Sequence, residues 1–454
     1  MEAVKNNICS SQAAKKDIYR PANVIKAVLL SLFGIFLIFV NIEINEQKSI
    51  PLDHMISFIL TNFGQAAKWF AVIMIFIGVI KVYFIDKTWN KGAANIFFSI
   101  MKLFSLPFSI MFLFNTGPAF LMKENIIPFL YNRVVVQWVW VIITGSICLA
   151  FLANFGLFEF VGVLARPLMR KVWSLPGFAA INAVACFVGS FTVGTVITNN
   201  LYKKGKYTTK EAVILLVGFG TVSATFMIIL ARSANIMQYW SIFFFSCMLV
   251  TFIVTAVNVR LWPVSKVPEV YWENEPDPEV EVNEKRFQTA IAQALETSDA
   301  APNLLILMKI AIWDAFKVIW GLMPTMGGLG IILLLLLDAT PVFDWISYIF
   351  YPVTYLLSLI GLSDPAMIAK SVAIATVEPT IACVVASGAE LATRFATAVT
   401  CVSVIVFWTG SLPCFLVSDI EFSVGKYMIV MLERMIIALT VAFLLSKLIF
   451  TIVT

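Results

Sequence analysis

The sequence is dominated by apolar runs that are long enough to cross a lipid bilayer. A spanning helix needs about 20 consecutive, mostly apolar residues. Only 13% of the 454 residues are charged, against about a quarter in a typical soluble domain. The composition therefore predicts an all-α, multi-pass membrane protein. The expected spans lie at about 23–42, 66–85, 94–114, 134–154, 209–231, 236–260, 317–338, 391–415 and 427–450.

The distribution of lysine and arginine predicts the orientation of the chain. Basic residues gather on the cytoplasmic side of membrane proteins, and the N-terminal tail, residues 1–22, carries four of them before the first apolar run. That run, Ala27 to Val40, has no small-residue cleavage site after it, so we expect it to remain as a span. The expected location is the inner (plasma) membrane, with the N-terminus in the cytoplasm.

Two of the apolar segments are interrupted in the middle. Residues 177–198 contain "GSFTVG", and residues 364–387 contain Glu378, Pro379 and Thr380. Lipid offers no hydrogen-bond partners, so non-helical backbone at membrane depth must be buried in protein or line a wet cavity. Proline removes a donor and frees a carbonyl, and glycine lets the backbone bend. We therefore predict that each segment is a re-entrant hairpin.

The two halves of the chain can be aligned as an internal repeat. Phe158 matches Phe343, and Pro167 matches Pro352, within two segments that each precede an interrupted run. The first of these segments, 157–173, is amphipathic and is expected to lie in the membrane interface. Basic residues flank both ends of the first hairpin, and three crossings separate the repeats. The second repeat is therefore expected to be inverted relative to the first.

Inverted repeats with broken hairpins are the arrangement of secondary transporters, in which the hairpin tips hold substrate and ion near the bilayer midplane. An intramembrane carboxylate is a functional-site hypothesis by default, so Glu378 and Thr380 are predicted to couple transport to an ion. The predicted substrate-binding residues are Gly189, Ser190, Thr192, Gly194, Thr195, Asn199, Glu378, Pro379 and Thr380.

Purely structural roles for these residues stay open at this point. Glu378 could be paired with Lys370, two turns away. The hydroxyls of the first hairpin could bond back to their own helix, and its glycines could serve helix packing. Asn199 and Asn200 could form a C-terminal cap.

Two charged residues, Glu433 and Arg434, fall within the last expected span. Charged side chains inside a membrane are costly and almost always face the protein interior, where they find partners. We therefore expect this pair to be satisfied inside the helix bundle.

The residue inventory argues against an enzyme. The only histidine, His54, lies outside any apolar pocket, and the seven cysteines form no CxxC motif. The "GGLG" at 327–330 lacks the lysine of a phosphate-binding loop. We therefore expect no catalytic residue, no metal site and no resident cofactor, with sodium or a proton as the coupling ion. The modest net charge of +5 gathers near membrane edges, which predicts contact with membrane lipid and no nucleic-acid partner.

Three motifs resemble a known family. They are "EFVGVLARPLMRKVWSLPG", then "VGSFTVGTVITNNLYKKGKYTTKEA", and the counterpart of both at 343–394. Together they resemble the nucleoside-recognition Gate domain proteins, specifically the YjiH-like integral membrane proteins, over roughly residues 130–450. The resemblance implies transport, because Gate domains also occur in concentrative nucleoside transporters, where the equivalent elements carry substrate and a coupling sodium or proton.

The expected organisation has five parts. They are the cytoplasmic tail 1–22, the N-terminal transmembrane helices 23–130, a first Gate-like repeat 131–262, an acidic cytoplasmic loop 263–302, and a second Gate-like repeat 303–454.

The expected function is ion-coupled symport of a small polar, nucleoside-like solute by alternating access. The N-terminal helices are a candidate homo-oligomer contact. The alternative is a non-transporting membrane scaffold or assembly factor resembling spore-maturation membrane proteins. In that case the acidic loop would bind a partner protein.

Overall fold

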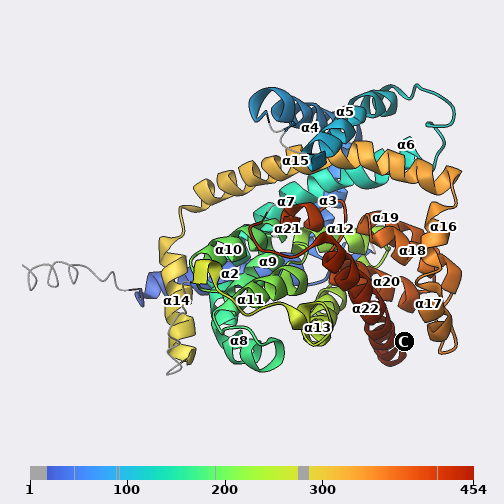
Figure 1. The fold of residues 1–454 in the computed structure, drawn as a ribbon. Helices are drawn as coiled ribbons and strands as arrows, with labels where there is room; N and C mark the ends of the chain where they lie inside the picture. The colour runs from blue at the N-terminus through green and yellow to red at the C-terminus, as the bar shows by residue number, and fades with distance from the viewer. Residues whose placement is uncertain are drawn as a thin grey trace, which may run out of the picture.

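The protein is built almost entirely from helices (Figure 1). The computed structural model describes residues 18–44, 47–87, 89–90, 93–189, 191–274, 286–416 and 418–453. It is 78% helical, and in the described residues eight helices are long and apolar enough to cross a membrane. The predicted class, an all-α multi-pass membrane protein, is therefore confirmed.

The N-terminal third combines peripheral helices with one central span. Helices α4 and α5 pack on each other and against the long helix α15, and they lie at one edge of the molecule in Figure 1. Helix α7 is mostly buried, whereas α2, α4 and α5 leave most of their residues on the outside. The elements are α2 (Pro21–Phe39), strands β1 (Ile42–Ile44) and β2 (Gln47–Ser49), α3 (Pro51–Asn62), α4 (Gly64–Ile80), η1 (Lys81–Ile85), α5 (Ala93–Phe114), α6 (Ile127–Phe129), η2 (Leu130–Val135) and α7 (Val136–Ala153).

Helix α15 is the longest element and joins the two halves of the chain. It runs from Leu304 to Ala339, whereas the sequence predicted a span only from 317. The prediction was short because charged residues precede that point. The structure keeps them on the outer face of the helix, where Lys317 pairs with Asp314 at 2.8 Å. In Figure 1 α15 lies between the α4–α5 pair and the remaining helices.

Two series of elements follow one another in the same order. Each series begins with one amphipathic helix (α8) or with two short helices (α16 and α17). A helical hairpin, a broken span and a long helix then follow. The first series is α8 (Leu157–Trp173), α9 (Ala179–Gly189), α10 (Phe191–Lys203), α11 (Thr209–Ile214), η3 (Leu215–Phe219), α12 (Ala224–Ser233), η4 (Met237–Tyr239) and α13 (Trp240–Asn258). The second is α16 (Val342–Ser347), α17 (Tyr351–Ser358), α18 (Pro365–Ala375), α19 (Pro379–Val385), η7 (Ala386–Gly388), α20 (Leu391–Ser403), α21 (Ser411–Leu416) and α22 (Val424–Val453).

Both interrupted segments form helical hairpins. Helix α9 packs against α10, and α18 packs against α19. The two legs of the first hairpin meet closely at Gly194, where any Cβ would overlap the Cys186 sulfur. The packing role left open for this glycine is therefore the one that the structure supports.

Two spans predicted to be continuous are in fact broken. The segment expected at 209–231 passes through a π-helical turn, η3, and leaves the helical conformation from Gly220 to Ser223. The segment expected at 391–415 stops at Ser403, and the chain is irregular over 404–410 before α21. Hydropathy did not predict these breaks, because the residues in them are themselves apolar or small.

The acidic loop predicted at 263–302 is only partly a linker. Short turns η5 (Val264–Lys266) and η6 (Trp272–Asn274) open it, and residues 275–285 lie outside the described residues. The expected short helix is α14 (Arg286–Ala300), and it packs against α8 and α2. Asn23 and Lys26 donate hydrogen bonds to backbone carbonyls of α14, which fixes its position.

The amphipathic helix α8 exposes the apolar face that the sequence identified. Leu164 and Leu168 lie on the outside, whereas Gly162, Val163 and Met169 face the protein. An outward apolar face beside Arg170 and Lys171 is what a helix in a membrane interface presents to lipid.

The glycines of α15 provide a test of this packing. A Cβ at Gly328 would overlap the Met101 carbonyl of α5, whereas a Cβ at Gly321 in the same helix would meet nothing within 4 Å. Alanine stabilises a helix interior by about 0.5–1 kcal/mol relative to glycine. We expect Gly321→Ala to raise the free energy of unfolding by about that amount. Gly328→Ala should lower it by about 1–3 kcal/mol, because the helices must separate.

Thermal unfolding of the two purified variants in the same detergent measures the difference. Equal midpoints for both variants would contradict the close contact between α5 and α15.

Candidate functional site

The second hairpin turns at a short non-helical segment that ends in Glu378. Helix α18 ends at Ala375, and Glu378 takes an extended conformation with φ −144° and ψ 102°. Pro379 is the first residue of α19, the position where its missing N–H costs nothing. The Glu378 side chain caps this helix by accepting a hydrogen bond from the Thr380 amide at 3.1 Å.

The Glu378 carboxyl group is buried and shares a hydroxyl group with the backbone. It is 2% exposed, and its Oε2 lies 2.7 Å from Thr409 Oγ1. The same Oγ1 also lies 2.7 Å from the Val377 carbonyl oxygen. A threonine hydroxyl has one hydrogen to donate, so it fully satisfies only one of these two acceptors. Each contact has a hydrogen of its own when the Glu378 carboxyl carries a proton and donates it to Thr409; otherwise the two acceptors share the single Thr409 hydrogen.

The hairpin tip and the break in the second broken span are joined through their backbones. The Trp408 amide donates to the Thr376 carbonyl at 3.0 Å, and the Thr409 amide donates to the Val377 carbonyl at 3.2 Å. Ser411 stabilises the non-helical conformation of this break. Its hydroxyl accepts from the Phe407 amide and donates to the Ile405 carbonyl. Non-helical backbone within the bundle is thus satisfied by other protein groups, as lipid surroundings require.

The first hairpin reaches the same break from the other side. The ring of Phe191, at the start of α10, meets the ring of Phe407 edge to face at 5.8 Å. A Cβ at Gly410 would lie 3.0 Å from the Phe191 ring. Thr192 Oγ1 lies 3.9 Å from the sulfur of Cys414 in α21. Both hairpin tips therefore contact residues 404–414.

The break in the first broken span joins this assembly through α21. A Cβ at Gly220 would lie 3.1 Å from the Phe415 ring, and the Gly218 carbonyl accepts from Thr255 Oγ1 at 2.8 Å. The Thr221 hydroxyl at this break is buried and has no hydrogen-bond partner among the described residues. The Thr380 hydroxyl at the second hairpin is also buried, and it lies beside the Glu378 carboxyl. An unpaired buried hydroxyl is costly, so Thr221 is a candidate to bind a polar solute.

A fully buried arginine donates hydrogen bonds to the backbone carbonyls at the break in the second broken span. Arg434 of α22 is 0% exposed, and its guanidinium donates to the carbonyls of Ser403 (2.7 Å) and Val404 (3.2 Å) at the end of α20. It also donates to Thr255 Oγ1 at 3.1 Å and to Asn258 Oδ1 at 3.4 Å. The end of a helix carries partial negative charge, so this all-oxygen cluster is a cation site that the protein fills with its own side chain.

Glu433 and Arg434 both find hydrogen-bond partners inside the bundle, and they are linked through Asn258. Glu433 accepts from Asn258 Nδ2 at 2.9 Å, and Asn258 Oδ1 accepts from Arg434. The alternative pairing of Glu378 with Lys370 is wrong, because Lys370 pairs with Asp344 at 2.7 Å.

The predicted substrate residues fall into two groups. Glu378, Pro379 and Thr380 lie at the second hairpin tip, against the broken span. Gly189 ends α9, and Thr192 lies beside α21, at the first hairpin tip. Ser190 lies outside the described residues.

The remaining predicted residues lie away from the tips. Thr195 bonds back to the Phe191 carbonyl at 2.7 Å, and Gly194 packs between the hairpin legs. Asn199 is neither at a tip nor a cap: it exchanges hydrogen bonds with Asp419 at 2.8 and 2.9 Å. Asp419 lies in the loop before α22, where Lys203 and Asn199 hold the pKa of its carboxyl below the usual range.

Sequence reasoning missed two site residues that the broken spans contribute, Thr221 and Thr409, and it also missed Thr255 of the long helix α13. The available signals were weak: "GFGT" at 218–221 and "TGSLP" at 409–413 combine small residues with glycine or proline inside apolar segments.

Comparison with known proteins supports the expected family resemblance in part of the chain. Residues 135–237, from α7 to η4, match the model of the Gate family, described as nucleoside recognition. An uncharacterized protein of Alkalihalophilus pseudofirmus is 24% identical over 469 residues, which cover 99% of this chain and 100% of the relative.

Solved structures of CNTnw are also similar. Its inward-facing, substrate-bound state is 11% identical, with a TM-score of 0.41 over 93% of this chain and 98% of CNTnw. An outward-facing variant is 13% identical, with a TM-score of 0.39 over 94% and 98%.

The role of Arg434 leads to a stability prediction. Replacing it with methionine leaves the Ser403 and Val404 carbonyls without their buried donor. We expect Arg434→Met to lower the free energy of unfolding by about 2–4 kcal/mol, because a buried acceptor left without its donor costs about 1–3 kcal/mol. Arg434→Lys, which keeps a cation, should cost clearly less.

The matched control is Arg133→Met, since Arg133 is exposed and surface changes usually stay within about 0.5 kcal/mol. Chemical or thermal unfolding in detergent measures all three variants. If Arg434→Met and Arg133→Met unfold alike, the carbonyl-capping role is incorrect.

Proposed function

We propose that the chain is a secondary transporter that carries a nucleoside-like solute across the membrane together with a proton. The observation that carries the proposal is the Glu378–Thr409–Val377 arrangement. A proton on the buried carboxyl there gives each of the two short contacts a hydrogen of its own, which favours the protonated form. The Gate match over residues 135–237 supports a nucleoside-like solute.

The proposed binding region is the meeting point of the two hairpin tips and the two broken spans. Thr221 offers a buried hydroxyl that has no partner in the described structure, and Thr380 offers a second buried hydroxyl beside Glu378. Hydroxyl groups can donate and accept, which suits the ribose hydroxyls and base edges of a nucleoside. Phe191, Phe407 and Phe415 lie at the same place and offer aromatic faces.

We propose a proton rather than sodium as the coupling ion. Freed carbonyls and half-helix ends are where transporters commonly coordinate sodium. Here the carbonyls at the end of α20 are already bound by Arg434. Glu378 is then the group that exchanges the coupling ion. It would take up a proton together with the solute on one side of the membrane and release it on the other.

We further propose that the two repeats are inverted relative to each other and that alternating access arises from movement of the hairpins against α15 and its neighbours. Glu378 and Thr380 are almost fully buried in the present structure, so a solute could reach them only if the tips part. On this proposal the N-terminus faces the cytoplasm, and a homo-oligomer through the N-terminal helices stays a prediction.

In the scaffold alternative the acidic loop, residues 263–302, would bind a partner protein. Helix α14 of this loop packs on α8 and α2 of the same chain, whereas residues 275–285, which carry most of its acidic side chains, lie outside the described residues.

The proton hypothesis predicts how nucleoside binding depends on pH. In the wild type, uridine or adenosine should raise the midpoint of thermal unfolding at acidic pH. The effect should fade as pH rises, because binding requires the protonated Glu378. A ligand at about 100 times its Kd stabilises the folded state by about 2.7 kcal/mol. Glu378→Gln imitates the protonated acid and should bind equally at every pH.

The matched control is Glu390→Gln, which changes an exposed glutamate of the same hairpin region and should keep the wild-type pH dependence. The same panel should include nucleobases, amino acids and sodium. Stabilisation that depends on sodium and not on pH would overturn the choice of ion. Stabilisation by another class of solute alone would overturn the choice of substrate.

A further inference from the structure

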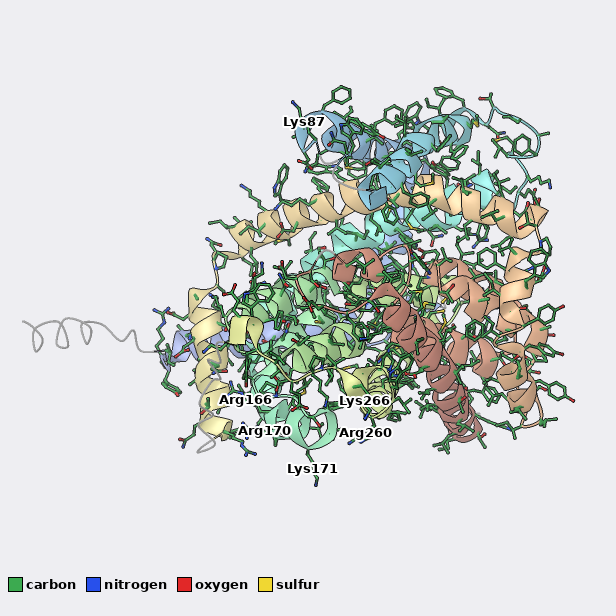
Figure 2. The ribbon with its side chains drawn as sticks, in the orientation of Figure 1. Lys87, Arg166, Arg170, Lys171, Arg260 and Lys266 are labelled. Carbon is green, nitrogen blue, oxygen red and sulfur yellow. The ribbon has the colours of Figure 1, made fainter. Side chains whose placement is uncertain are left out.

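One end of the molecule carries a concentration of basic side chains. Figure 2 shows Arg166, Arg170 and Lys171 of α8 gathered there together with Arg260 and Lys266, which follow α13. The labelled Lys87 lies at the opposite edge, near α4. The binding region proposed above uses none of these residues.

A groove of about 550 Å³ lies between the C-terminal ends of α8 and α13. Its floor is apolar and is formed by Val172, Ile253, Ala256 and Val257. Lys171 and Arg260 are the two charged residues that line it. The groove thus offers an apolar surface next to two positive charges.

Arg260 is fixed in place but keeps hydrogen-bonding capacity. Its Nη1 donates to the Val172 carbonyl at 3.1 Å and to the Ala256 carbonyl. Within the described part of the chain its Nε and Nη2 have no partner, and Lys171 forms no ion pair. A planar guanidinium with open donors recognises phosphate oxygens well, because two N–H groups can point at one phosphate.

The neighbouring residues indicate a position at the membrane surface. Trp262 follows the groove and is 56% exposed, and exposed tryptophans are typical of the level of the lipid headgroups. The apolar floor continues along α13, which is long and apolar enough to span the bilayer. A molecule seated here would have its charged part beside Lys171 and Arg260 and its apolar part along α13.

We propose that this groove binds an anionic phospholipid. The phosphate lies between Lys171 and Arg260, and one acyl chain covers Ile253, Ala256 and Val257. A free phosphate would leave the apolar floor uncovered, whereas a zwitterionic lipid would leave the paired positive charges less well compensated. Basic pockets between transmembrane helices are a recognised way of holding anionic headgroups. The bound lipid would join α8 to α13, the first and last helices of the first repeat.

The test is lipid binding to the purified full-length protein, followed by native mass spectrometry in a neutral detergent. Phosphatidylglycerol should bind to the wild type more tightly than phosphatidylcholine with the same acyl chains. Each basic residue near an anionic lipid contributes about 1 kcal/mol. Lys171→Gln should therefore weaken phosphatidylglycerol binding about fivefold, and Lys171→Gln with Arg260→Gln about thirtyfold.

The control variant is Lys87→Gln, an exposed cation at the opposite edge, which should bind phosphatidylglycerol like the wild type. Lys171 makes no structural hydrogen bond in the described residues, so its single variant keeps the test valid if the double variant folds poorly. Equal binding of the two lipids, or an equal loss in Lys87→Gln, would overturn the proposal. Inorganic phosphate that competes fully with phosphatidylglycerol would show an anion site without a role for the acyl chain, which also overturns it.

Discussion

Every interruption of a helix inside this bundle has to find its hydrogen-bond partners within the protein, because lipid supplies none. Within the described residues of the two repeats, such interruptions occur at the second hairpin tip and within the two broken spans. They are satisfied by one another or by side chains: Thr376 and Val377 receive the amides of Trp408 and Thr409, and Thr255 donates to Gly218. This requirement explains why segments far apart in the sequence meet at one place.

The same requirement links the two repeats. Thr255 of α13 donates to a carbonyl at the first broken span and accepts from Arg434, which holds the carbonyls at the second. The two breaks are therefore connected through one threonine and one arginine. A buried guanidinium is costly unless its donors are satisfied, and here its donors reach two carbonyls, a hydroxyl and an amide oxygen. The free-energy cost of burying the Arg434 guanidinium is offset because it gives hydrogen bonds to the buried carbonyls at the end of α20.

Much of the fold could be predicted from the sequence, because the dominant signals are local. The apolar runs predict the spans, and Glu378 with Pro379 predicts the second hairpin. The amphipathic pattern of 157–173 predicts α8. These features depend on residue type and spacing alone, and so they can be recognised before any tertiary contact is known.

The rest depends on long-range contacts. The breaks at 220–223 and 404–410 lie in apolar sequence and are stabilised by groups from other helices, so hydropathy reads them as continuous spans. Thr409 gains its importance only from its position beside Glu378, 31 residues earlier in the chain. Asn199 was predicted either to bind substrate or to form a C-terminal cap, but its side chain exchanges hydrogen bonds with Asp419, which lies 220 residues later in the chain.

The most direct test of the central claim is uptake of radiolabelled uridine into proteoliposomes that contain the purified protein. An inside-alkaline pH gradient and an inward sodium gradient would be imposed separately at the same membrane potential. Proton coupling through Glu378 predicts accumulation of uridine above equilibrium under the pH gradient, no accumulation under the sodium gradient, and none in Glu378→Gln under either. Accumulation driven by sodium, or accumulation in Glu378→Gln driven by the pH gradient, would contradict it.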